Sequence, residues 1–127
     1  MNAILMLAAL AEAGTGVILL AYPLIVVRLL FDAEIAGAGV SMSRLAGIAL
    51  IGLGAACWPA TDNRRAFQGM VTYSVLAMLF LIYIGVRNEG VGLLLWPGVV
   101  VHAILIVLLA GAWLKQRTNP ATPRHVQ

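Results

Sequence analysis

The sequence predicts an all-α integral membrane protein, folded as an antiparallel four-helix transmembrane bundle. Of its 127 residues, 62% are hydrophobic and 10% are charged, whereas a soluble domain carries about 25% charged residues. The mean hydropathy is +0.99, and the apolar residues gather in four long runs. Each run approaches or exceeds the roughly 20 residues that cross the hydrocarbon core of a bilayer. We therefore expect one transmembrane domain at residues 1–114 and a polar, disordered tail at 115–127.

The first expected span, residues 3–27, carries a carboxylate near its middle. Glu12 stands in the string AALAEAGTG. A signal peptide has basic residues ahead of an apolar core of about 7–15 residues. This run is longer, and only Met1 and Asn2 precede it. We therefore expect it to be retained as the first helix.

The first loop, residues 28–39, is not plainly polar. Its sequence RLLFDAEIAGAG places three large apolar residues directly after Arg28. One interpretation is a short interfacial helix from Arg28 to Glu34, whose apolar side chains enter the lipid. The other is a ragged end of the first helix beyond Pro23. The sequence leaves both open.

The other expected spans, joined by short polar loops, are residues 40–58, 66–86 and 91–114. Small residues in the first two spans, such as Gly16, Gly47 and Gly54, let helix backbones approach closely. In the third span, Tyr73 begins an aromatic series at helical spacing, and Thr72 lies beside it. Such a series more often packs helices together than binds a cofactor.

Two ionisable residues are expected near the middle of the membrane, Glu12 in the first span and His102 in the fourth. A charge there costs about 2.5–3.5 kcal/mol on insertion scales, so Glu12 must face the interior, pair or bind a proton. At 1.5 Å per residue, Glu12 lies about 14 Å and His102 about 18 Å from the same membrane side. The pair is either a titratable centre or a structural clamp. Arg44, Tyr73 and Thr72 are the candidate supporting residues.

The basic residues predict the orientation. With four spans, the N-terminus, the loop at 59–65 and the tail share one side of the membrane, which holds five Lys and Arg residues against three on the other. The positive-inside rule then places both termini in the cytoplasm. Arg44, near the start of the second span, is expected to extend to the outer surface toward Asp32, Glu34 or Glu89.

The sequence lacks the residues that several kinds of site require. The single cysteine, Cys57, excludes an internal disulfide and any paired-cysteine motif. A bis-histidine haem needs two facing imidazoles, and the other histidine, His125, stands in the tail. No nucleophile triad or phosphate-binding loop is present. The sequence favours a protein that is not an enzyme, with no cofactor, no metal and no nucleic-acid partner.

The string ALAEAGTG around Glu12 resembles the first helix of the small multidrug resistance transporters. That resemblance, confined to one helix, implies that Glu12 exchanges protons for cationic substrates within a dimer. More of the chain is similar to small bacterial four-helix membrane proteins of unassigned function. The similar stretches are RLLF from Arg28, RLAGIAL from Arg44, CW from Cys57, and WP ahead of His102. This second resemblance implies the fold and a bacterial inner membrane.

These features lead to two main hypotheses of function. The first is a small non-catalytic membrane protein that serves as an accessory or packing subunit of a membrane complex or of a homo-oligomer. The alternative is a small proton-coupled carrier that works as an oligomer, with Glu12 as the titrating group and His102 as its modulator. A role in binding lipid or quinone is the third.

Overall fold

The structure, a computed structural model, describes residues 2–58 and 63–118, in which every regular element is a helix. The five helices of these ranges are α1 (Asn2–Ala21), α2 (Pro23–Phe31), α3 (Ala38–Ala56), α4 (Asn63–Arg87) and α5 (Leu95–Thr118). Four of the described helices are long and apolar enough to cross a membrane, namely α1, α3, α4 and α5. The prediction of an all-α chain with four long apolar helices is confirmed.

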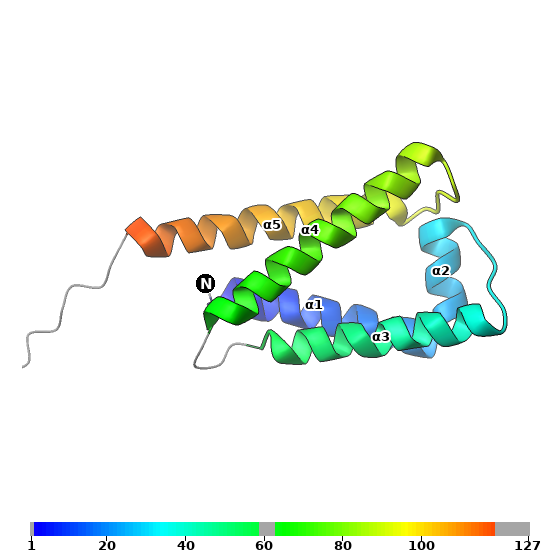
Figure 1. Cartoon of the computed structure of the whole chain (residues 1–127), viewed down its shortest axis with the longest axis horizontal. Helices are drawn as coiled ribbons and strands as arrows, with labels where there is room; N and C mark the ends of the chain where they lie inside the picture. Colours follow the sequence, from blue (N-terminus) through cyan, green and yellow to red (C-terminus); the bar gives the residue numbers. More distant parts are fainter. Residues whose placement is uncertain (1, 59–62, 119–127) are drawn as a thin grey trace, which may run out of the picture.

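The long helices form two pairs (Figure 1). α1 packs along α3 and α4 packs along α5, and these two contacts are far more extensive than any other between helices. Within each pair the chain runs in opposite directions. The pairs approach each other at the end that holds the N-terminus and diverge toward the end that holds α2. α1 and α5, the helices that carry Glu12 and His102, contact each other only sparsely.

The buried apolar core lies where the two pairs meet. Its buried members come from all four long helices or their ends: Leu5, Ala8, Ala9, Cys57, Phe67, Met70 and Leu109. Beside them the rings of Phe67 and Trp113 are stacked, with centroids 6.3 Å apart and planes 11° apart. This cluster holds the α1–α3 pair against the α4–α5 pair.

Glycine residues make the close contact between α1 and α3. A Cβ atom on Gly16 would lie 2.6 Å from the carbonyl oxygen of Gly47, and one on Gly47 would lie 2.7 Å from the carbonyl oxygen of Gly16. Farther along, a Cβ atom on Gly54 would lie 2.6 Å from the carbonyl oxygen of Ala9. A side chain at any of these positions would force the helices apart.

The chain turns sharply between α1 and α2. Pro23 is the first residue of α2, and a proline disfavours the helical conformation in the residue before it. Tyr22 accordingly has φ −128° and ψ 57°. The range 3–27, expected to be one span, is therefore divided between two helices. A short helix is present after the first span, as one interpretation of the loop proposed, but it begins at Pro23 rather than Arg28.

α2 ends against the loop between α4 and α5. The N–H groups of Gly92 and Leu94 donate to the carbonyl oxygens of Leu30 and Leu29, at 3.0 Å and 2.8 Å respectively. Carbonyls in the last turn of a helix have no partner within the helix, so the loop satisfies two of them. These bonds join the α1–α3 pair to the α4–α5 pair at the end where the two diverge.

The remaining boundaries differ modestly from expectation. α4 begins at Asn63, earlier than expected, and α5 begins at Leu95, later than expected. The start of α5 is delayed because the chain before it bonds to α2 instead of continuing a helix. α5 runs to Thr118, so the first residues of the expected disordered tail are helical. The rest of that tail, 119–127, and part of the second loop, 59–62, lie outside the described residues.

Candidate functional site

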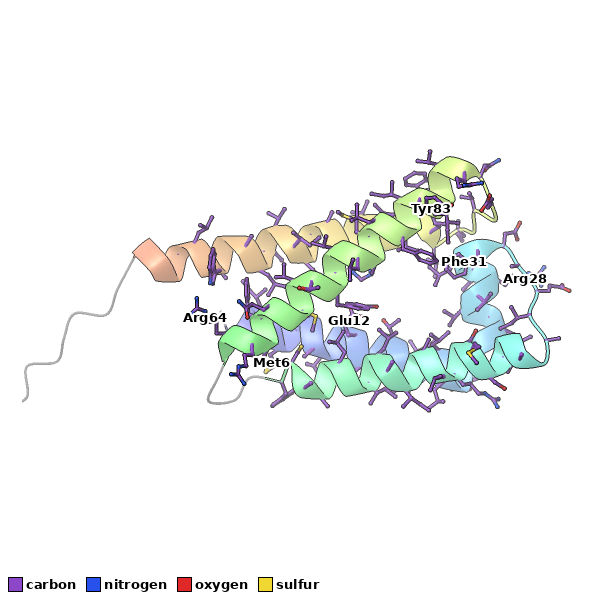
Figure 2. The ribbon with its side chains drawn as sticks, viewed as in Figure 1. Met6, Glu12, Arg28, Phe31, Arg64 and Tyr83 are labelled. Carbon is purple, nitrogen blue, oxygen red and sulfur yellow. The ribbon has the colours of Figure 1, made fainter. Side chains whose placement is uncertain are left out.

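Glu12 is enclosed in the interior of the molecule. The residue is 4% exposed, although the rest of α1 is almost entirely apolar. It follows Leu5 and Ala8 at helical spacing, and both of these belong to the buried core. The packing of that face of α1 therefore carries the carboxyl group inward with it. Figure 2 places Glu12 in the space between the two helix pairs.

Tyr73 of α4 is the side-chain partner of Glu12. A side-chain hydrogen bond joins the two residues, in which the phenol hydroxyl is the donor when the carboxyl group is ionised. Tyr73 is partly buried. The contact therefore links α1 of one helix pair to α4 of the other.

The ring of His102, on α5, contacts the ring of Tyr73. The two ring centroids are 5.8 Å apart and the planes are inclined by 73°, which is an edge-to-face contact. The Nδ1 atom of His102 is buried and has no hydrogen-bond partner among the described residues. Glu12 and His102, expected as a pair, are not bonded to each other directly; Tyr73 lies in contact with both.

Ser74 is a second buried polar residue, and it is not among the residues expected from the sequence. It is 0% exposed, and its Oγ atom has no hydrogen-bond partner within residues 2–58 and 63–118. Ser74 lies one turn beyond Met70 and two turns beyond Phe67, on the face of α4 that enters the core. The signal that could have identified it is this helical spacing from large apolar residues.

The other expected supporting residues lie outside this cluster. Thr72 is exposed on α4, and Arg44 is exposed on α3. In the described part of the chain no ion pair joins Arg44 to a carboxylate. One of its expected partners, Glu89, instead accepts a hydrogen bond from Nε of Arg87 at 2.9 Å.

The cluster of Glu12, Tyr73 and His102 supports two kinds of chemistry. A carboxyl group, a phenol and an imidazole in contact can hold or pass a proton away from water. The same contacts can instead fix the rotation of three helices relative to one another. Among the described residues no three His, Cys, Asp or Glu side chains are grouped as a metal site would require.

Comparisons of the chain with protein-family models, with curated proteins and with solved structures find no match. The fold and the site therefore show only the general class of the protein. Within the residues that the structure describes, it is all-helical, with four helices apolar enough to span a membrane and a polar cluster between them.

Proposed function

We propose that the chain is a small multi-pass integral membrane protein without catalytic activity, which serves as an accessory or packing subunit of a membrane complex or of a homo-oligomer. The observation that supports this is how little of each long helix the chain itself covers. Even in α1, the most covered, only 28% of the most apolar window is buried. Water-soluble monomers rarely expose contiguous apolar patches larger than a few hundred Å². Lipid and neighbouring helices would cover these faces.

Three outward-facing glycines support a helical neighbour as well as lipid. A Cβ atom on Gly14 of α1, Gly52 of α3 or Gly111 of α5 would meet nothing within 4 Å. The packing of the chain itself therefore does not require glycine there. In membranes, small residues on a helix face allow a second helix to approach closely. These positions are where an incoming subunit would make its closest contact.

The helix dimensions fit an antiparallel four-span arrangement in a bilayer. The 20 residues of α1 measure about 30 Å, which matches the hydrocarbon core. The 25 residues of α4 are longer, and a long span tilts to fit, in line with the oblique course of α4 in Figure 1. Trp58 and Trp96, both about half exposed, stand near opposite ends of the long helices, as interfacial aromatic residues do.

The first test is extraction from native membranes in mild detergent, followed by the mass of the intact complex and identification of its components. We expect an assembly of defined stoichiometry that is larger than one chain. Gly52→Leu, Gly14→Leu and Gly111→Leu are then tested singly, and at least one is expected to lower the assembled mass while the chain stays folded. A chain that is always monomeric, with no protein partner, would exclude the subunit role.

A second candidate function, a proton-coupled carrier working as an oligomer, is favoured by the enclosed cluster of Glu12, Tyr73 and His102. In it Glu12 would exchange a proton for cargo, with His102 as modulator. Glu12→Gln keeps the shape of the side chain but removes the titrating group. A carrier would lose transport with its assembly intact and would release protons when cargo binds, whereas a packing subunit would keep its function.

A further inference from the structure

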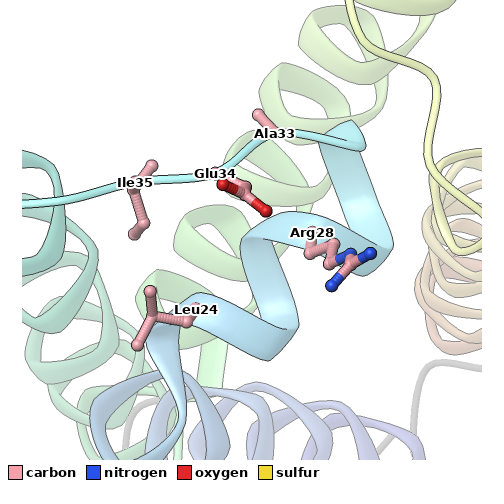
Figure 3. Close-up of a pocket in the computed structure, with 5 residues that line it drawn as sticks. All are labelled: Leu24, Arg28, Ala33, Glu34 and Ile35. Atoms are coloured by element: carbon pink, nitrogen blue, oxygen red, sulfur yellow. The ribbon is translucent and has the colours of Figure 1, made fainter.

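A pocket lies between α2 and the segment that leads from it to α3 (Figure 3). Its lining residues are Leu24, Arg28, Ala33, Glu34 and Ile35, and it encloses about 290 Å³. Sites for drug-sized ligands measure about 300–1,000 Å³. The pocket is therefore suited to a small polar group rather than to a whole lipid or a large cofactor. Leu24, Arg28 and Glu34 are all exposed, so it opens to the surface.

The end of α2 gives the pocket its shape. Asp32 adopts a left-handed conformation with φ 48°, and its N–H donates to the carbonyl oxygen of Arg28 at 2.9 Å. This conformation ends the helix and turns the chain back beside it. Leu24 and Arg28 are four residues apart and share one face of α2. Figure 3 shows that the segment with Glu34 and Ile35 runs beside that face.

Two opposite charges line the pocket without neutralising each other. Within residues 2–58 and 63–118, neither an ion pair nor a hydrogen bond joins the side chains of Arg28 and Glu34. Arg87, at the same end of the molecule, is engaged: it binds Glu89 at 2.9 Å and the Tyr83 hydroxyl at 2.8 Å. Arg28 and Glu34 therefore keep their donors and acceptors for a ligand that carries both charges.

The position of α2 indicates where that ligand would come from. α2 lies across the ends of the long helices (Figure 1). If the long helices span a bilayer, as proposed above, α2 lies along the interface at the depth of the lipid headgroups. Its Leu24 and Ile25 are 55% and 57% exposed, so apolar side chains face the lipid beside the charged pocket.

We propose that this pocket binds the headgroup of a zwitterionic phospholipid that carries a primary ammonium group. The Arg28 guanidinium would bind the phosphate, since its planar fork matches phosphate oxygens. The Glu34 carboxylate would accept hydrogen bonds from the ammonium group. An anionic headgroup without an amine would leave Glu34 unpaired next to like charge, and a trimethylammonium group has no N–H to donate.

The test uses the full chain in mild detergent, with bound lipid counted by native mass spectrometry. Phosphatidylethanolamine, phosphatidylcholine and phosphatidylglycerol with identical acyl chains are titrated separately. Phosphatidylethanolamine is expected to bind about tenfold more tightly than either of the others, because one charge-assisted hydrogen bond is worth about that factor. Arg28→Gln and Glu34→Gln are each expected to weaken it by about tenfold. Arg87→Gln is the matched control and leaves binding unchanged.

One further variant, in which the two charges are exchanged, and a competitor make the result decisive. The exchange of Arg28→Glu with Glu34→Arg keeps both charges and is expected to bind more lipid than either single variant. Equal binding of the three lipids, or unchanged binding in both single variants, would overturn the proposal. Displacement by soluble phosphoethanolamine at equal concentration would show that a free phosphorylated amine, not a lipid, is the ligand. Because the titration needs no partner protein, its outcome is separate from that of the subunit proposal.

Discussion

At the residue scale, Tyr73 decides how the buried carboxyl group of Glu12 is satisfied. It is the hydrogen-bonding side chain that reaches Glu12, and its ring also contacts His102. The three residues come from three different helices, so a change at Tyr73 acts on the docking of the two helix pairs. A structural clamp and a proton-handling site would both depend on this contact, but they respond differently to its loss.

We predict that Tyr73→Phe lowers the free energy of unfolding by about 1.5–3 kcal/mol, the range for a hydrogen bond to a charged or buried group. The ring and its contact with His102 are kept, so only the hydroxyl is lost. Thermal unfolding in detergent measures the effect. Tyr83→Phe is the control on the same helix: its hydroxyl is bound to exposed Arg87, and its removal is expected to cost about 0–1 kcal/mol. Equal effects would mean that the buried bond contributes nothing special.

We predict that Cys57 reacts slowly with maleimide until the protein unfolds. The residue, just beyond the last residue of α3, is 2% exposed, and its thiol donates to the carbonyl oxygen of Ala66 at 3.4 Å. Burial, and to a lesser degree the nearby Glu12, raises the pKa of this thiol. The thiolate is the reactive form, so less of it is present at a given pH and labelling rises only at higher pH. Rapid labelling of folded protein at pH 7 would show that the core around Cys57 is open.

All three residues of this cluster are candidates from the sequence, but the position of Tyr73 between the other two is not predicted by it. Glu12 and His102 are conspicuous because each is an ionisable residue within a long apolar run. The bridging position of Tyr73 depends on how α1, α4 and α5 are rotated about their axes. That rotation is set by side-chain packing across three helices, which spacing along one helix does not contain. Thr72, which directly precedes Tyr73 on the helix, illustrates this: its side chain is exposed, whereas that of Tyr73 is partly buried.

At the element scale, the pairing of α1 with α3 depends on residues without side chains. Gly16 and Gly47 place their backbones in mutual contact, and Gly54 does so against Ala9. In a membrane there is no hydrophobic drive to bring helices together, so close van der Waals packing must do it. The other glycine of α3, Gly52, faces open space. α3 therefore carries both a glycine in close contact, Gly54, and a control glycine, Gly52.

We predict that Gly54→Leu separates α1 from α3 and lowers the free energy of unfolding by at least about 1–3 kcal/mol, the usual cost of overpacking. The new Cβ atom would meet backbone, which cannot move aside as a flexible side chain does. Gly52→Leu is expected to leave the unfolding midpoint of the single chain nearly unchanged. Unfolding curves of both variants in the same detergent give the comparison. Leu favours a helix more than Gly does, so similar losses for the two would show that the close contact at Gly54 is not the cause of the cost.

The break at Pro23 illustrates what hydropathy omits. Residues 22–27, YPLIVV, are as apolar as the span before them, so composition alone extends the first span through them. The end of α1 is conformational instead, because the proline acts on the backbone of Tyr22. The direction of α2 then follows from its bonds to the α4–α5 loop, which lies far away in the sequence.

At the scale of the whole molecule, composition and run length were sufficient for the helical class and for the number of long apolar helices. They did not predict that these helices would form two pairs that diverge. All four are apolar around most of their circumference, so hydropathy gives no reason for α1 to choose α3 over α5. The choice follows from the glycines that face each other across α1 and α3.

We predict that both chain ends lie on the cytoplasmic side of the membrane. Figure 1 shows the start of α1 and the end of α5 at the same end of the molecule, and that end carries more of the basic residues. Protease-cleavable tags at the N-terminus and at the C-terminus should be cut together in inside-out vesicles and protected together in right-side-out ones. Protection of one tag and cleavage of the other would require an odd number of spans.

The contact of Glu12 with Tyr73 and His102 has a consequence for how the protein is made. Glu12 belongs to α1, and its contacts belong to α4 and α5, which leave the ribosome later. At about 5–20 residues per second, roughly 3–12 seconds separate the synthesis of Glu12 from that of Tyr73. During this interval the nascent first helix carries a carboxyl group without its partner. If the long helices span a membrane, as proposed, that carboxyl group must bind a proton, stay near water or lie at a polar surface of the insertion machinery until α4 arrives.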